Sequence, residues 1–191
     1  MCEAFGGLRQ PLTDIELAKA CSLRDWNAQA MLFDKFKVKM FALCLRFARS
    51  YEEGEDILQE GFVHVFNDIN QFKGIGSLEG WIRKIVLRTA LSYIKKRTNE
   101  LQIVELADLE NKLIYEMEQI EVDFDDPKSL ISLLQKMPDG FRAVMNLYVL
   151  EEKSHEEIAS LLGISESTSR SQLSRGKEFL RKLVHKRLMI I

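Results

Sequence analysis

Hydroxyl and cationic side chains share one face of a predicted helix that begins after Ser165. At about 100° of rotation per residue, these side chains fall on the same side of the helix as Arg170. Small side chains let a helix approach a DNA groove, and arginine and lysine reach phosphates and guanine edges. The pattern favours a DNA-recognition helix over an ordinary helical hairpin with a solvated basic face. The candidate contacts are Ser167, Thr168, Arg170, Ser171, Ser174, Arg175, Lys177 and Arg181.

The residues before this helix have the spacing of a helix-turn-helix motif. Ser154 and Glu157 form a predicted capping box, in which each side chain satisfies a free backbone N–H of the other residue. Ala159 is small enough for a second helix to approach, and Gly163 tolerates a left-handed turn between the two helices. Ser165 then caps the recognition helix.

A second candidate DNA surface lies on the predicted helix from Ser77 to Arg97. Lys84, Arg88 and Lys95 form a basic stripe, and Trp81 borders it. A cationic stripe beside an aromatic ring can follow a phosphate backbone while unstacked bases rest on the ring. For Trp81 itself, packing into the core is the favoured interpretation. The opposite face of this helix is apolar and is predicted to be buried: Leu78, Ile82, Ile85, Val86, Thr89 and Tyr93.

A third group of residues lies on the predicted helix around Asp56. Asp56, Gln59, Glu60 and Val63 share one face, opposite an inward apolar stripe. Carboxylates near the start of a helix are favoured by its dipole in any case, so this face alone indicates only a solvated helix start. The inward stripe is Leu58, Phe62, Val65 and Ile69.

The sequence shows no catalytic constellation. There is no paired carboxylate, no Ser/His/Asp set and no phosphate-binding glycine loop, because Gly74-x-Gly76 is too short for a dinucleotide motif. The histidines at 64, 155 and 185 lack metal-ligand spacing. We therefore expect neither an enzyme nor a metal, cofactor or small-molecule substrate.

The composition is that of a helical globular protein. Of its 191 residues 46% are apolar and 29% charged, and neither glycine nor proline occurs between Trp81 and Asp126. No uncharged run approaches the roughly twenty residues needed to span a bilayer, and the first residues lack the basic start and apolar stretch typical of a signal peptide. The three cysteines, at positions 2, 21 and 44, indicate no disulfide framework. We expect an all-α, cytoplasmic protein that does not insert into membranes.

The net charge of −2 conceals a strong segregation of charge along the chain. Residues 73–98 carry seven basic side chains and one acidic one, and residues 165–191 carry seven basic and two acidic ones. Residues 99–127, between them, carry one basic and ten acidic side chains. Local positive charge is what surfaces that meet nucleic acid need. The sequence therefore predicts two small helical domains, at residues 13–98 and 128–187, joined by an acidic linker at 99–127.

Helix limits follow from caps and breakers. Thr13 is a predicted N-cap, Gly54 a predicted break, and Met137-Pro138 a helix stop. The predicted helices of the first domain span residues 14–20, 26–49, 55–70 and 77–97, and one in the second domain spans 141–150.

Four strings in this chain together resemble the extracytoplasmic-function (ECF) sigma factors, small two-domain members of the sigma-seventy superfamily. They occur in the family's order over residues 14–184, and the presence of all four strings in that order is highly specific for the family. The strings are Asp56-Ile-Leu-Gln-Glu-Gly-Phe62, Gly76-Ser-Leu-Glu-Gly-Trp-Ile-Arg-Lys-Ile85, Leu134-x-x-Met-Pro138 and Glu157-Ile-Ala-x-Leu-Leu-Gly-Ile-Ser165.

The resemblance implies a transcription initiation factor that binds core RNA polymerase and promoter DNA. The face with Asp56, Gln59, Glu60 and Val63 would dock on the polymerase clamp helices. Phe72, the loop to Gly76 and the stripe with Trp81, Lys84, Arg88 and Lys95 would melt and contact the minus-ten element. The second domain would contact the minus-thirty-five element. The group commonly has an anti-sigma partner, and the sequence identifies none.

The chain departs from the family pattern at four positions. Arg88 replaces a usual Asn and Ser92 a common Asp, so no minus-ten base preference carries over. In the recognition helix Ser169 replaces a β-branched apolar residue, and Gly176 replaces Ala. Because glycine inside a helix costs about 1 kcal/mol, this helix is expected to depend on packing for its order.

Two other classes of protein remain as alternatives. One is a regulator that binds DNA through its helix-turn-helix motif and never acts as a polymerase subunit. Such a regulator would not need the Asp56–Phe62 string or the basic stripe before Arg97. The other is a helical adaptor that binds only protein, which the basic faces disfavour.

Overall fold

The computed structural model describes residues 12–101 and 127–188, which form helices and no strands. The predicted all-α class is confirmed. We call residues 12–101 the first unit and residues 127–188 the second unit; most of the predicted acidic linker lies outside the described residues. The first unit contains α1 (Asp14–Ser22), α2 (Trp26–Phe47), α3 (Tyr51–Asp68), the 3-10 turn η1 (Ile69–Gln71) and α4 (Leu78–Leu101). The second contains α6 (Pro127–Lys136), α7 (Asp139–Met145), the π-helical turn η2 (Asn146–Leu150), α8 (His155–Leu162) and α9 (Glu166–Leu188).

The predicted helix caps are present in the structure. Thr13 and Glu16 form a capping box at α1, and Ser154 and Glu157 form one at α8. The Ser77 hydroxyl accepts the Gly80 N–H at 3.0 Å at the start of α4. These local hydrogen bonds satisfy N–H groups that the first helical turn leaves without partners.

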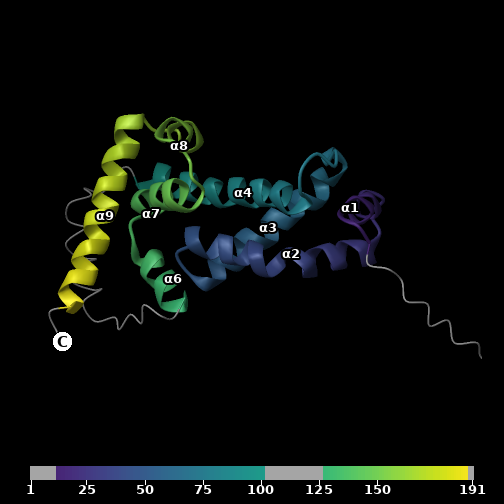
Figure 1. Cartoon of the computed structure of the whole chain (residues 1–191), viewed down its shortest axis with the longest axis horizontal. Helices are drawn as coiled ribbons and strands as arrows, with labels where there is room; N and C mark the ends of the chain where they lie inside the picture. The colour runs from purple at the N-terminus through teal and green to yellow at the C-terminus, as the bar shows by residue number, and fades with distance from the viewer. Residues whose placement is uncertain (1–11, 102–126, 189–191) are drawn as a thin grey trace, which may run out of the picture.

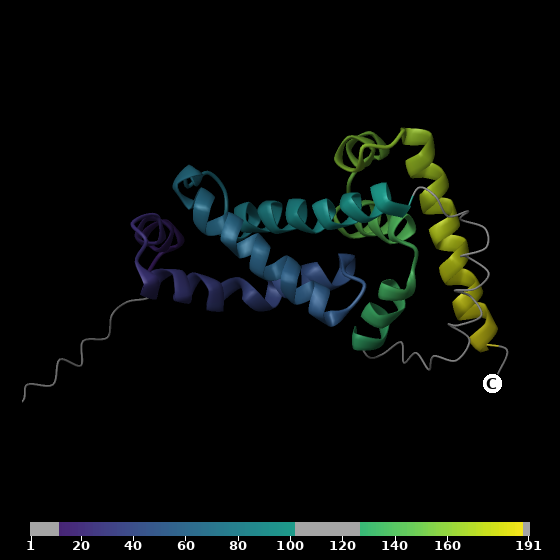
Figure 2. The same ribbon diagram turned by 180° about the vertical axis from the view of Figure 1, so that it is seen from behind.

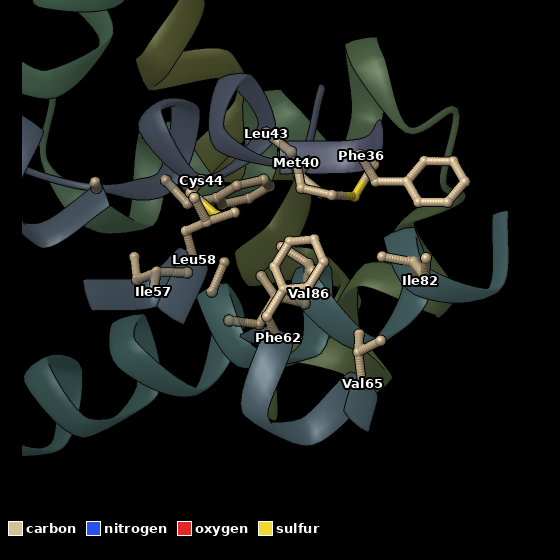
Figure 3. Close-up of a cluster of buried hydrophobic side chains, with 14 of the residues drawn as sticks. Phe36, Met40, Leu43, Cys44, Ile57, Leu58, Phe62, Val65, Ile82 and Val86 are labelled. Carbon is tan, nitrogen blue, oxygen red and sulfur yellow. The ribbon is translucent and has the colours of Figure 1, made fainter. Parts of the chain in front are cut away.

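Helices α2, α3 and α4 enclose the core of the first unit (Figure 3). The apolar stripe predicted on the helix around Asp56 is buried, as the sequence predicts: Leu58, Phe62, Val65 and Ile69. Figure 3 shows Leu58, Phe62 and Val65 beside apolar residues of the neighbouring helices: Phe36, Met40, Leu43 and Cys44 of α2, and Ile82 and Val86 of α4.

The predicted helix break at Gly54 is wrong. Ser50 is the N-cap of α3, so that Gly54 lies in the first turns of the helix and is buried. A Cβ atom on Gly54 would come within 2.8 Å of Leu45 Cδ2 and 3.3 Å of Phe41 Cε2. The glycine therefore permits close approach of α2 and α3 and does not end a helix.

The second unit is built around the helix-turn-helix pair α8 and α9. Gly163 joins them with φ 71° and ψ 35°, the left-handed conformation that the sequence predicts there. Helix α7 begins at Asp139, two residues before the predicted start, after Pro138. A Cβ atom on Gly176 would lie 3.0 Å from Met145 Sδ, so this glycine lets α9 lie closely against α7.

The two units pack against each other. Helix α9 stands across one end of the molecule, close to the carboxyl end of α4, whereas α1 lies at the opposite end (Figures 1 and 2). Helix α4 contacts α7 and α8, and α2 contacts α6 and α7. One continuous buried cluster joins first-unit residues such as Val86 and Ile94 to Val144, Leu147 and Ile158 of the second unit.

Candidate nucleic-acid interface

The outer face of α9 presents the predicted minus-thirty-five contacts to solvent. The Ser165 hydroxyl accepts the Thr168 N–H at 3.0 Å and so fixes the start of the helix. Thr168 is half-buried, and seven predicted contacts are exposed: Ser167, Arg170, Ser171, Ser174, Arg175, Lys177 and Arg181. The structure thus brings all eight onto or beside one accessible face.

Several polar groups on this face have partners within their own helix. Arg170 forms an i,i+4 ion pair with Glu166, and its side chain is 60% exposed. The Ser171 hydroxyl donates to the Thr168 carbonyl at 2.9 Å. Exposed ion pairs of this kind contribute about 0–1 kcal/mol. Arg170 is therefore available to exchange Glu166 for a phosphate or a base edge.

A buried hydroxyl explains one departure from the family pattern. Ser169 is fully buried, and its Oγ lies 2.9 Å from Nδ1 of His155 on α8. The His155 ring stacks on Tyr148 with a centroid separation of 4.9 Å, and Lys177 Nζ lies 5.8 Å from the Tyr148 centroid. Because Ser169 has a polar partner, a hydroxyl is accommodated where the family usually has an apolar side chain.

The basic stripe on α4 is also open to solvent. Lys84, Arg88 and Lys95 are exposed, and none of them has an ion-pair partner among the described residues. Trp81 is half-buried and packs against the core, with its ring 5.8 Å from that of Phe72. The core-packing interpretation of Trp81 therefore fits, and Phe72 shares that role.

The loop before α4 displays an apolar side chain that the sequence analysis did not single out. Gly74 and Gly76 adopt φ values of 71° and 78°, which side chains other than glycine rarely tolerate. Between them, Ile75 is 86% exposed. The two flanking glycines were the available signal, because they mark a loop in which Ile75 lies outside any helix.

The candidate polymerase surface lies on α3. Asp56 and Gln59 are exposed, Val63 is 56% exposed, and Glu60 is half-buried. The Tyr93 hydroxyl on α4 donates to Glu60 at 2.9 Å. Burial, and then the hydrogen bond to Glu60, raise the pKa of Tyr93 to about 12. This contact, which the sequence analysis missed, joins the candidate polymerase surface to the candidate DNA helix.

Within residues 12–101 and 127–188 no group of three or more His, Cys, Asp or Glu side chains is arranged to hold a metal. The thiols of Cys21 and Cys44 are free and buried, and burial raises their pKa values to about 11 and 12. None of the described helices is long and apolar enough to cross a membrane.

Comparison with known proteins defines the class to which this fold belongs. Residues 32–100 match the Sigma-70 region 2 family, and residues 128–180 match Sigma-70, region 4. These are the two modules of a sigma-70-type initiation factor. The chain is 30% identical to the ECF RNA polymerase sigma factor SigW of Bacillus subtilis, over 83% of this chain and 89% of SigW. This chain belongs to the ECF RNA polymerase sigma factors.

Two further proteins are similar. The chain is 28% identical to the ECF RNA polymerase sigma factor SigE of Mycolicibacterium smegmatis, over 78% of this chain and 58% of that protein. Its fold is similar to that of the sigma factor RpoE from Bartonella quintana, solved with the anti-sigma factor NepR. That likeness has a TM-score of 0.50 and 16% identity, over 82% of this chain and 96% of RpoE.

Family membership sets the general activity. The chain is a transcription initiation factor that directs RNA polymerase to promoters. A regulator with only a helix-turn-helix motif is not favoured, because the region 2 match covers residues 32–100, outside that motif.

Proposed function

We propose that this sigma factor divides its work among three surfaces. Asp56, Gln59, Glu60 and Val63 on α3 dock on core RNA polymerase. Phe72, Trp81, Lys84, Arg88 and Lys95 hold and open the minus-ten element, with Phe72 and Trp81 acting as the packed base of that surface. The eight α9 residues named above contact the minus-thirty-five element.

One observation supports this proposal more than any other. The exposed, unpaired stripe of Lys84, Arg88 and Lys95 on α4 occurs in the same chain as the exposed cationic face of α9. Phosphate neutralisation supplies most non-specific affinity for DNA, so both surfaces can bind DNA. With two separate DNA surfaces, one protein can contact two promoter elements at once. Its acidic and partly apolar docking face would hold it on the polymerase.

The energetics favour joint action of the two units. Taking a base out of the stack costs a few kcal/mol, and one good base contact returns about 1–3 kcal/mol. A single small unit therefore gains little on its own. Mounting both units on one polymerase makes the second contact intramolecular and raises its effective concentration.

The sigma factor and the polymerase have separate tasks. The chain acts in the cytoplasm, where it supplies promoter choice and strand opening while the polymerase forms the RNA bonds. It performs no bond chemistry itself. The domain limits of 13–98 and 128–187 stay predictions.

Pull-down of core polymerase followed by run-off transcription tests this function. The chain should be retained by core polymerase and should support initiation from a cognate promoter. Asp56→Arg should weaken retention by about tenfold or more, because it reverses a charge on the docking face. Asp34→Arg, an equivalent reversal at an exposed position of α2, is the control. Equal retention of both variants, or no retention of the unaltered chain, would overturn the proposal.

A further inference from the structure

A hydrogen bond joins the start of α8 to the first turns of α9. His155 is the first residue of α8, and its Nδ1 lies 2.9 Å from the Ser169 hydroxyl of α9. Ser169 is fully buried, whereas its neighbours Thr168 and Arg170 belong to the candidate minus-thirty-five face. The bond therefore ties the DNA-facing end of the recognition helix to the helix before it.

This bond restrains the rotation of α9 in a way that apolar packing does not. The buried apolar side chains of the two helices include Ile158 and Leu173, and the hydrophobic effect that holds such side chains has no preferred direction. A hydrogen bond has one, because it weakens steeply when donor and acceptor are out of line. Serine also fills less space than the β-branched residue usual in the family at position 169, so packing fixes the helix less firmly there.

Small rotations of α9 matter for contacts to bases. The outer atoms of side chains lie about 6 Å from a helix axis, so a rotation of about 10° moves them by about 1 Å. Hydrogen bonds form over a range of only about 0.5 Å in donor–acceptor distance. A rotation of this size would therefore weaken base contacts by Arg170 or Ser171. Contacts to phosphates depend more on charge and carry no sequence information.

The His155 ring makes a second connection to α9. It stacks on the Tyr148 ring with a centroid separation of 4.9 Å and an interplanar angle of 25°. Lys177 Nζ lies 5.8 Å from the centroid of the same Tyr148 ring, within the range of a cation–π contact. Through Tyr148, the imidazole thus helps to place a second cation of the candidate face, about 12 Å along α9 from Ser169.

We propose that His155 is a positioning residue for minus-thirty-five recognition. Its Nδ1 sets the rotation of α9 through Ser169, and its ring sets the place of Lys177 through Tyr148. His155 acts through these residues and needs no contact with DNA of its own. The effect on DNA rests on the proposed function of α9, whereas the placement of α9 by His155 does not.

Two substitutions at position 155 separate the hydrogen bond from the ring. His155→Phe keeps a ring against Tyr148 and removes the Nδ1 atom. The Ser169 hydroxyl then has an alternative acceptor in the Ser165 carbonyl, which already accepts the Ser169 N–H, so the variant can fold. His155→Asn keeps a hydrogen-bonding atom near the place of Nδ1 and removes the ring. Ser160→Ala, at an exposed position of α8, is the control.

Sequence discrimination is measured with the chain bound to core RNA polymerase. The probes are a duplex that the unaltered complex selects from a random minus-thirty-five library and the scrambled form of that duplex. His155→Phe should reduce the ratio of the two affinities about fivefold, the low end of the value of one base contact, with the affinity for the scrambled duplex unchanged. His155→Asn should weaken binding to both duplexes alike, by about two- to fivefold, because it disturbs only the cation–π arrangement.

Thermal unfolding midpoints separate positioning from simple support of the fold. Asparagine buries less apolar surface than phenylalanine, so His155→Asn should unfold at the lower temperature. A purely structural role would then give His155→Asn the lower discrimination, whereas positioning gives it to His155→Phe. Ser169→Ala should lose discrimination as His155→Phe does. Combining these two substitutions should cause no further loss, because both remove the same bond.

Distances between nitroxide labels report the placement of α9 without DNA. Labels at the exposed positions Ser160 and Lys182 report on α8 and α9, in a free chain whose Cys2 is replaced by Ser and whose Cys21 and Cys44 are buried. The unaltered chain and the His155→Asn variant should each give a narrow distribution. The His155→Phe variant should give a broader one.

The remaining outcomes each decide one question. Equal distance distributions in the two variants at position 155, or equal discrimination by them, would overturn the positioning role. Distances as expected in a chain whose polymerase complex selects no minus-thirty-five sequence would contradict the proposed function of α9. That result would leave the placement of α9 by His155 established.

Discussion

The hydroxyl of Tyr93 donates a hydrogen bond of 2.9 Å to Glu60, across the interface between α4 and α3. Glu60 lies on the candidate polymerase surface, and Tyr93 lies on the helix that carries Lys84 and Arg88. Under the proposed function, in which α3 docks on polymerase, this hydrogen bond helps to set the direction in which the basic stripe of α4 points. The hydrogen bond thus connects the candidate polymerase surface to the candidate DNA helix.

Tyr93→Phe should destabilise the chain by about 1 kcal/mol at neutral pH, because it removes this hydrogen bond. The pKa of Tyr93 is about 12 in the folded chain, against about 10 in an unfolded one. Between those values only the unfolded chain loses the proton, so the stability of the unaltered chain falls relative to that of the variant. Urea unfolding of both chains at pH 7 to 11.5 measures the difference between their free energies of unfolding. A difference that stays constant over this pH range would contradict the raised pKa of Tyr93.

Ser169→Ala should lower the free energy of unfolding by about 1 kcal/mol, because the buried hydroxyl is the partner of His155 Nδ1. Ser171→Ala is the matched control on the same helix, since Ser171 is exposed. Thermal unfolding followed by circular dichroism compares the two. Equal midpoints for both variants would show that the Ser169 hydroxyl carries no net stabilisation.

Gly163→Ala should destabilise the helix-turn-helix by about 1–2 kcal/mol. The cost is conformational, because φ is 71° and no atom lies within 4 Å of the position a Cβ would take. Gly163→Asn should cost less, since asparagine tolerates the left-handed region better. Denaturant unfolding of the three chains ranks them, and an alanine variant as stable as the unaltered chain would contradict the conformational argument.

Arg170→Ala and Lys177→Ala should weaken promoter binding in different ways. If Arg170 contacts a base, its loss should cost about 1–3 kcal/mol on the preferred sequence and little on others. Loss of a phosphate contact at Lys177 should weaken all sequences alike and reduce the salt dependence of log K by about 0.9. Fluorescence anisotropy of the polymerase-bound chain on matched and scrambled duplexes separates these effects. If both variants lose affinity equally on all sequences, Arg170 contacts a phosphate and not a base.

Features governed by neighbouring residues were predictable from the sequence. The caps at Thr13, Ser77, Ser154 and Ser165 depend on atoms within three residues of each cap, and all are present. Gly54 was misjudged because its role depends on Leu45, whose side chain approaches from another helix. Local propensity gives no information about that approach.

The candidate surfaces were predictable as faces of helices, whereas their connections were not. Periodicity placed the α9 contacts and the α4 stripe outward, and the structure agrees. Glu151 and its partner Arg83 are 68 residues apart, and no spacing rule links them. Arg83 itself belonged to no predicted surface, because a lone arginine beside a basic stripe gives no sign of a distant carboxylate.

Asn146 and Gln135 of the second unit donate to the Arg46 and Leu45 carbonyls at the end of α2, which has a consequence for synthesis on the ribosome. These side chains follow the carbonyls they satisfy by 100 and 90 residues. At about 5–20 residues per second, several seconds pass between translation of the helix end and translation of its partners. Until those partners emerge, water must hydrogen-bond the carbonyls of Leu45 and Arg46 in their place.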